Sequence, residues 1–194
     1  KELLIKGSTV LVKQENNPNR KTKYSAQMVK IKKDLFVSLN TLLPNKLVKH
    51  LLYNKNILEY SNWNLLQSEK KIGDSRFDFL LGQFKNKMIL EVKSVSLVKN
   101  NIALFPDAIT KRGTKHLKHL MELKDRGYYT SILFVIQRKD AKSFMPNYEC
   151  DPIFSKNLEL AYKKGVLINV IKIEVLPSKL SNLGKIPLKF DNIT

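Results

Sequence analysis

The chain of 194 residues carries 35 Lys or Arg against 17 Asp or Glu, which gives a net charge of +18. Hydrophobic residues make up 43% of it, enough to form the core of one sizeable domain with or without a small appendage. The charge excess favours a polyanionic partner, although a Lys- and Asn-rich proteome would also produce it. The sequence has no apolar run of about 18 residues, no secretory signal and a single cysteine, so we expect a soluble cytoplasmic protein without a membrane partner, an internal disulfide or an all-Cys zinc site.

Residues 1–40 predict a small β-module of three short strands. The strands are expected at Thr9–Gln14, Gln27–Lys32 and Leu35–Leu39. A polar loop separates the first two and contains Arg20 and Lys21, which are candidates for contact with DNA phosphates. Three short strands bury little surface by themselves. We therefore expect this module to be incomplete at its N-terminus.

Residues 41–194 predict an α/β domain with a mixed sheet. Helices are expected from Pro44 through Tyr53, at about Thr110–Arg126, and at Asp151–Lys164. Strands are expected at Asn64–Lys70, Arg76–Leu81, Lys87–Lys93, Ser131–Gln137 and Val166–Val175. The last two strands are each preceded by a helix, which predicts parallel, right-handed crossovers.

The strands Arg76–Leu81 and Lys87–Lys93 carry the most informative residues. A hairpin loop centred on Phe84 and Lys85 would place Asp78 opposite Glu91. Glu91 and Lys93 are two residues apart on one strand, so they share a face. Two carboxylates and an ammonium group would then converge on one side of the sheet.

This grouping predicts a site for Mg²⁺ or Mn²⁺ that acts on a phosphate. Asp78 and Glu91 supply the hard oxygen ligands that such cations prefer. Lys93 could orient or deprotonate a water, or stabilise the transition state. The alternative is that a half-exposed sheet produces Glu-x-Lys by chance. The apolar flanks of both strands favour the metal site, because burying unpaired charge is costly.

Two further residues are weaker candidates for this site. Glu69, on the preceding strand, is either a third metal-binding acid or a surface residue beside Lys70 and Lys71. Gln137 ends a strand expected next to the one that carries Glu91. It would position the attacking water, or simply close the strand.

Basic residues gather at the start of the helix near Thr110. They are Lys111, Arg112, Lys115, His116, Lys118 and His119. Positive side chains at a helix N-terminus oppose the helix dipole, an arrangement that a docked phosphate would explain. The alternative is a solvated helix face. The two histidines lack a third ligand, so no zinc site is predicted.

Several motifs resemble the sugar fermentation stimulation protein family (SfsA) over nearly the whole chain. The motifs include Asn40–Val48, Ser75–Leu81 (SRFDFLL), Leu90–Leu97 (LEVKSVSL), Phe105–Leu117 (FPDAITKRGTKHL) and the segment from Leu133 to Asn147. The run at Phe105–Leu117 is the most specific of them.

The resemblance implies a PD-(D/E)XK core, a restriction-endonuclease-like mixed sheet flanked by helices, behind an N-terminal OB-like module. The two would occupy residues 41–194 and 1–40. It also implies DNA binding and a link to the regulation of sugar metabolism genes. Asp78, Glu91 and Lys93 match the acids and lysine of the core, and Glu69 matches an acid on the strand before.

The chain departs from the family pattern in two places. Relatives extend further at the N-terminus, and His50 stands where relatives carry Glu on the first helix. The lost acid makes strong catalysis less expected. Two functions therefore remain: a metal-dependent nuclease, or a DNA-binding regulator that does not cut. A basic module that binds another protein is the least economical alternative. The sequence leaves the oligomeric state open, a dimer included.

Overall fold

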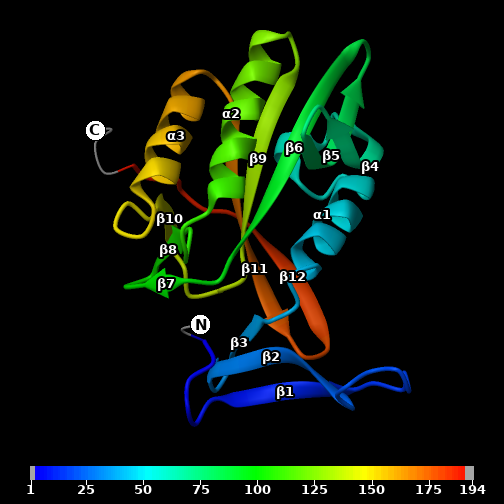
Figure 1. Cartoon of the computed structure of the whole chain (residues 1–194), viewed down its shortest axis with the longest axis vertical. Coiled ribbons are helices and arrows are strands. Elements are labelled where there is room, and N and C mark those ends of the chain that lie inside the picture. Colours follow the sequence, from blue (N-terminus) through cyan, green and yellow to red (C-terminus); the bar gives the residue numbers. More distant parts are fainter. Residues whose placement is uncertain (1–2, 191–194) are drawn as a thin grey trace.

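The computed structural model describes residues 3–190, and its largest element is a six-stranded mixed sheet (Figure 1). The strand order is β12-β11-β9-β6-β5-β4. In chain order the strands are β4 (Asn64–Ile72), β5 (Ser75–Gln83), β6 (Asn86–Val95), β9 (Tyr129–Ile136), β11 (Leu167–Leu176) and β12 (Lys179–Lys185). Strands β6, β9 and β11 run parallel, and the other neighbours pair antiparallel. The expected mixed sheet with parallel crossovers is confirmed.

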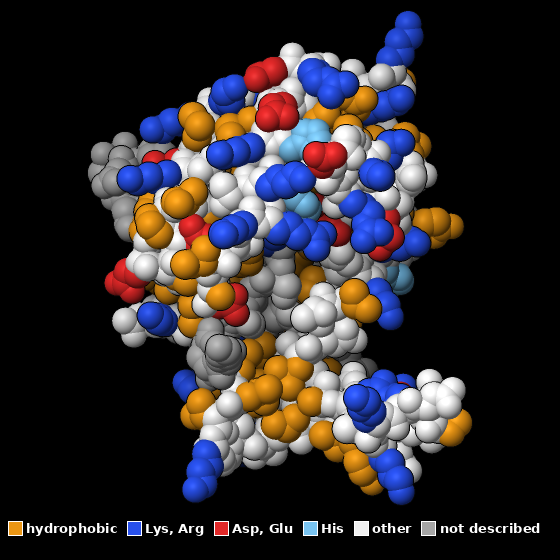
Figure 2. All heavy atoms as spheres, in the orientation of Figure 1, with side chains coloured by type: hydrophobic (Ala, Val, Ile, Leu, Met, Phe, Trp, Pro, Cys, Tyr) orange, Lys and Arg blue, Asp and Glu red, His pale blue; other side chains and the backbone are white. Residues whose placement is uncertain are grey.

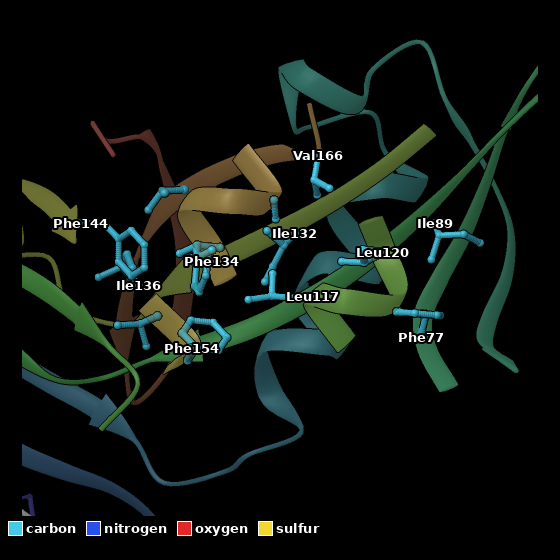
Figure 3. Close-up of a cluster of buried hydrophobic side chains, with 14 of the residues drawn as sticks. Phe77, Ile89, Leu117, Leu120, Ile132, Phe134, Ile136, Phe144, Phe154 and Val166 are labelled. Carbon is cyan, nitrogen blue, oxygen red and sulfur yellow. The ribbon is translucent and has the colours of Figure 1, made fainter. Parts of the chain in front are cut away.

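Three α-helices cover the two faces of this sheet. They are α1 (Leu43–Tyr53), α2 (Lys111–Asp125) and α3 (Pro152–Lys163). Helices α2 and α3 pack on one face, where Leu117 and Phe154 meet Ile132 and Phe134 of β9 (Figure 3). Helix α1 packs on the other face. Strand β9 is buried along almost its whole length because both faces are covered, as its apolar sequence predicted.

The helix ends follow from local chemistry. The Thr110 side chain accepts a hydrogen bond from the Gly113 N–H and caps α2, and Gly127 follows the helix with a φ of +88°. Asp151 was expected as the first residue of α3. It instead caps that helix by accepting a hydrogen bond from the Phe154 N–H. None of the helices within residues 3–190 is long and apolar enough to cross a membrane.

A separate antiparallel sheet precedes α1. It has the order β1-β2-β3, with β1 (Thr9–Gln14), β2 (Tyr24–Lys32) and β3 (Leu35–Ser38). It lies at the foot of the molecule in Figure 1, and β3 contacts β11 of the main sheet. The strands expected here are present, and β2 begins three residues earlier than predicted.

A third, smaller sheet was not predicted from the sequence. It has the order β10-β8-β7, with β7 (Val98–Lys99), β8 (Ile102–Phe105) and β10 (Ser143–Pro146). No strand was predicted between Lys93 and Thr110, where β7 and β8 lie. The four-residue strand β8 is paired with the distant β10, a long-range contact that local pattern does not reveal. Strand β12 and the short 3-10 helix Leu58–Tyr60 were also not predicted.

Candidate functional site

The hairpin of β5 and β6 has the register that the sequence predicted. Phe79 pairs with Leu90, and Leu80 pairs with Ile89. At the next position the hydrogen bond between the strands is made by a side chain: Asp78 Oδ2 accepts a hydrogen bond of 2.7 Å from the Val92 N–H. This bond holds the Asp78 carboxylate against β6, beside Glu91.

A small cavity of about 230 Å³ opens where Asp78 and Glu91 meet. Helix α1 contributes Asn45, β6 contributes Lys93, and the start of α2 contributes Arg112. Elements far apart in the chain thus converge on one hollow. The structure brings Asp78, Glu91, Lys93 and Arg112, all predicted as site residues, to the same place.

Glu91 is almost fully buried, and its two carboxylate oxygens have different surroundings. Oε1 lies 2.5 Å from Lys93 Nζ and 2.5 Å from His116 Nδ1. Oε2 is buried and has no hydrogen-bond partner among the described residues. Burial alone would raise the pKa of Glu91, but the hydrogen bond from His116 and the charge of Lys93 outweigh it and hold that pKa below its ordinary value.

Asp78 shows the opposite shift. Burial and the nearby charge of Glu91 raise its pKa to about 6, against the opposing effects of the Val92 N–H, Lys93 and Asn45. Asn45 Nδ2 donates to Asp78 Oδ1 at 2.5 Å, so both Asp78 oxygens are held in place. The two carboxylates repel one another, and a cation between them would relieve that repulsion.

The donor set fits a hard divalent cation that keeps most of its own water. Glu91 Oε2, a buried oxygen without a hydrogen bond among the described residues, stands beside Asp78, whose pKa is raised by burial and by Glu91. Mg²⁺ is commonly held by one or two carboxylates together with waters and substrate phosphate. Within residues 3–190 no group of three or more His, Cys, Asp or Glu side chains is arranged to hold a metal ion, so Asp78 and Glu91 would supply two ligands at most.

Glu69, the predicted third acid, does not line the cavity. Ser68 pairs with Phe79 and Lys70 with Phe77, so Glu69 lies across from Asp78 in the ladder. Its φ is +54°, however, and its side chain is 74% exposed and lies 3.8 Å from Arg76. The positive φ turns the Glu69 side chain outward, and the regular alternation of side chains along a strand does not predict this.

His116 has a different place from the one predicted. It was expected to hold phosphate on the surface of α2, but it is buried and contacts Glu91. The signal was available in the sequence, because His116 stands four residues before Leu120 and therefore on the apolar side of the helix. Its imidazole orients a site carboxylate from inside the core.

The remaining predicted DNA contacts lie on two other surfaces. Lys111 and Lys115 are exposed on α2 and line a second, larger hollow. Arg20 and Lys21 are exposed in the loop between β1 and β2, on the N-terminal sheet. The structure does not bring these two pairs into the cavity with Asp78.

Two more polar residues sit near the cavity. Ser94 lines it, and Gln137 Nε2 donates to Ser94 Oγ at 2.6 Å. Gln137 was expected near Glu91 but lies beside Ser94 and Val95, because the β9 residue that pairs with Glu91 is Ile132. His50 is exposed on α1 and does not line the cavity, whereas Asn45 of the same helix does.

A mixed sheet covered by helices on both faces, with two acids and a lysine on adjacent strands, defines a protein with an α/β core behind a small β-module. Family models match both parts: the sugar fermentation stimulation protein RE domain over residues 42–179, and the SfsA N-terminal OB domain over residues 1–39. The chain belongs to the sugar fermentation stimulation protein family. The predicted division between residues 40 and 41 stays a prediction.

Relatives and one solved structure agree with this assignment. A sugar fermentation stimulation protein homolog of Clostridium tetani is 43% identical over 176 residues, covering 90% of this chain and 76% of the relative. One of Clostridium botulinum (strain Langeland) is 41% identical over 182 residues, covering 93% and 79%. The structure of Pyrococcus furiosus SfsA in complex with Ca²⁺ superposes with a TM-score of 0.88 at 23% identity, covering 97% of this chain and 80% of that one. At this level of identity, the similarity to the Pyrococcus furiosus structure shows a shared fold.

Proposed function

We propose that this chain is a DNA-binding protein whose Asp78–Glu91–Lys93 centre hydrolyses phosphodiester bonds with a bound Mg²⁺ or Mn²⁺. The observation that carries the proposal is the buried, unpartnered Oε2 of Glu91 beside Asp78. A buried carboxylate oxygen without a partner is costly, and a cation supplies the missing interaction. The Ca²⁺ described for the Pyrococcus furiosus relative supports a preference for hard divalent cations in this fold.

The chain's own residues would share the work as follows. A divalent cation held by Asp78 and Glu91 would lower the pKa of a coordinated water and neutralise charge on the phosphate. Lys93, whose side chain is 14% exposed, can donate to an oxygen that gains charge during the displacement. Arg112 is exposed and lines the cavity, so its guanidinium can donate two hydrogen bonds to the non-bridging oxygens of a phosphate.

DNA is the proposed partner because of charge and its placement. The net charge is +18, and Lys and Arg side chains spread over the face of α2 in Figure 2. Lysine contacts backbone phosphate without reading sequence, so affinity for DNA should fall steeply as salt rises.

Plasmid nicking tests this function. Supercoiled plasmid is incubated with protein in Mn²⁺, in Mg²⁺ and in EDTA, and the open-circular and linear forms are quantified. We expect metal-dependent cleavage that falls about a hundredfold or more in Asp78→Asn and Lys93→Met. Asp125→Asn is the matched control, since Asp125 is an exposed acid paired with Lys164 on the far end of α2. Cleavage that survives both site substitutions would rule out this centre.

A non-catalytic DNA-binding regulator of sugar metabolism genes is the second candidate. Glu69 lies outside the cavity, so only Asp78 and Glu91 among the described acids are positioned for a metal. A regulator would shift the mobility of DNA in EDTA, keep that shift in Asp78→Asn, and leave the plasmid intact under every metal condition.

A further inference from the structure

A second hollow, of about 700 Å³, lies on the outer side of α2. The turn between β4 and β5, at Gly73 and Asp74, forms one wall, and α2 forms another. Ile109, before α2, and Ile153, at the start of α3, complete the lining. Pockets of roughly 300–1,000 Å³ are large enough to enclose small organic groups such as a base and its sugar.

One wall of this hollow is basic. Lys111, Lys115 and Lys118 are exposed and follow one another at helical spacing, so their ammonium groups share a face. Like charges three or four residues apart destabilise a helix, and positive charge near a helix N-terminus adds to the cost. A polyanion lying along this face would offset both effects.

Three acids also line the hollow, and among its exposed groups the three lysines exceed the acids by one charge. Asp151 is buried, and its carboxylate accepts hydrogen bonds from the backbone N–H groups of Thr110 and Phe154. Only Asp74 and Glu122 are exposed there.

Two exposed isoleucines add apolar surface to the lining of the hollow. Ile109 is 75% exposed and Ile153 is 65% exposed, and both line the space. A duplex presents phosphates and sugars to such a recess, because its base faces are stacked on one another. An unpaired base can instead cover an apolar side chain while its phosphate reaches a lysine.

The first turn of α2 separates this hollow from the Asp78 cavity. Thr110, Arg112 and Gly113 line the cavity, whereas Lys111, Thr114 and Lys115 line the hollow. A strand that crosses this turn would therefore pass from one space to the other, with basic side chains on both sides.

We infer that the hollow between α2 and the β4–β5 turn binds unpaired nucleotides of single-stranded DNA, next to the Asp78 cavity. Phosphates lie on Lys111, Lys115 and Lys118, and a base covers Ile109 or Ile153. The inference deepens the proposed function, on which its link to cleavage rests, by making a single strand or a frayed end the preferred substrate.

Binding without metal separates this inference from catalysis. A fluorescent single-stranded oligonucleotide of about 12 nucleotides and the same sequence as a blunt duplex are titrated in EDTA, with anisotropy as the readout. We expect the wild-type chain to bind the single strand about tenfold more tightly than the duplex. Equal or tighter duplex binding would overturn the inference.

The variants are made at exposed residues, so we expect them to fold like the wild-type chain. Lys115→Ala should weaken single-strand binding and reduce the slope of log affinity against log salt by about 0.7. Lys163→Ala is the matched control, because Lys163 is an exposed lysine at the end of α3 outside both hollows. The same loss in both variants would contradict a role for this hollow.

The isoleucines test the base contact. The double variant Ile109→Ser with Ile153→Ser should lose on the order of threefold in single-strand affinity and keep its duplex affinity. An equal effect on both forms, or displacement of the oligonucleotide by poly-glutamate at matched charge, would mark a general polyanion surface and refute the inference. If the single-strand preference and its variants behave as expected but no plasmid is cut, the nuclease proposal fails and the binding site stands.

Discussion

His116 Nδ1 lies 2.5 Å from Glu91 Oε1, and both side chains are buried. The carboxylate accepts this bond and a second one from Lys93 on the same oxygen. The two donors fix the plane of the carboxylate and leave Oε2 as the oxygen available to a cation. A histidine on a helix thereby sets the orientation of an acid on the neighbouring strand.

Replacing His116 should therefore weaken metal binding. Partners that orient a metal-binding side chain typically contribute tenfold to a hundredfold in affinity, and we expect a loss of that order for Mn²⁺ in His116→Ala, measured by titration calorimetry. His116→Asn keeps a donor near the position of Nδ1 and should recover part of the affinity. His50→Ala is the control, since His50 is exposed. If His116→Ala lowers only the free energy of unfolding and leaves Mn²⁺ affinity unchanged, the histidine is structural.

Asp78 predicts a pH dependence of stability in metal-free protein. Its pKa is raised to about 6 by burial and by Glu91, so the folded state holds this proton more tightly than the unfolded state. The resulting stabilisation is present below pH about 4 and is lost as pH rises through about 6.

Asp78→Asn removes that titration. Relative to wild type, the free energy of unfolding of the variant should rise by about 1–3 kcal/mol between pH 4 and pH 8, as measured by urea denaturation in EDTA. Parallel pH profiles for the two proteins would show that Asp78 ionises as freely in the folded state as in the unfolded state.

Added Mn²⁺ should stabilise the folded chain through Glu91. A ligand present at about a hundred times its dissociation constant adds about 2.7 kcal/mol to the free energy of unfolding. We expect a matching rise in melting temperature for wild type and none for Glu91→Gln. Asp125→Asn should respond like wild type, and a similar rise in Glu91→Gln would place the cation elsewhere.

A buried polar cluster under the main sheet gives a prediction about stability alone. Tyr60 OH lies 2.7 Å from Ser131 Oγ and accepts a hydrogen bond of 3.0 Å from Asn169 Nδ2. Burial, only partly opposed by these hydrogen bonds, raises the pKa of Tyr60 to about 12.

Tyr60→Phe would leave the Asn169 donor without its partner, at a cost of about 1–3 kcal/mol in urea denaturation. Tyr53→Phe should change nothing, because Tyr53 is 78% exposed. Equal unfolding midpoints for the two variants would mean that Asn169 finds another partner.

The parts of the site that could be predicted are those set by local pattern. The apolar runs on either side of a tight loop fix the register of β5 and β6, and alternation then puts Glu91 and Lys93 on one face. The start of α2 could be predicted from Thr110, a residue type that commonly caps helices and does so here. Each of these depends on residues close together in the chain.

The parts that could not be predicted depend on distant contacts or unusual backbone. Asn45 reaches Asp78 only because α1 packs across the sheet from a different part of the chain. Glu69 turns outward because its φ is positive, a conformation that is uncommon for glutamate and cannot be predicted from the residue type. The sheet of β7, β8 and β10 forms from strands of two to four residues, too short for alternation to be recognised.

Strand β6 is the interior member of the sheet that joins the antiparallel hairpin to the parallel strands, and it carries both Glu91 and Lys93. Local fraying of surface loops leaves such a strand untouched, because its backbone is anchored on both sides. The acid and the amine should therefore keep their spacing until the whole sheet melts. Heat or denaturant would abolish metal affinity in the same cooperative transition that unfolds the protein, with no earlier loss.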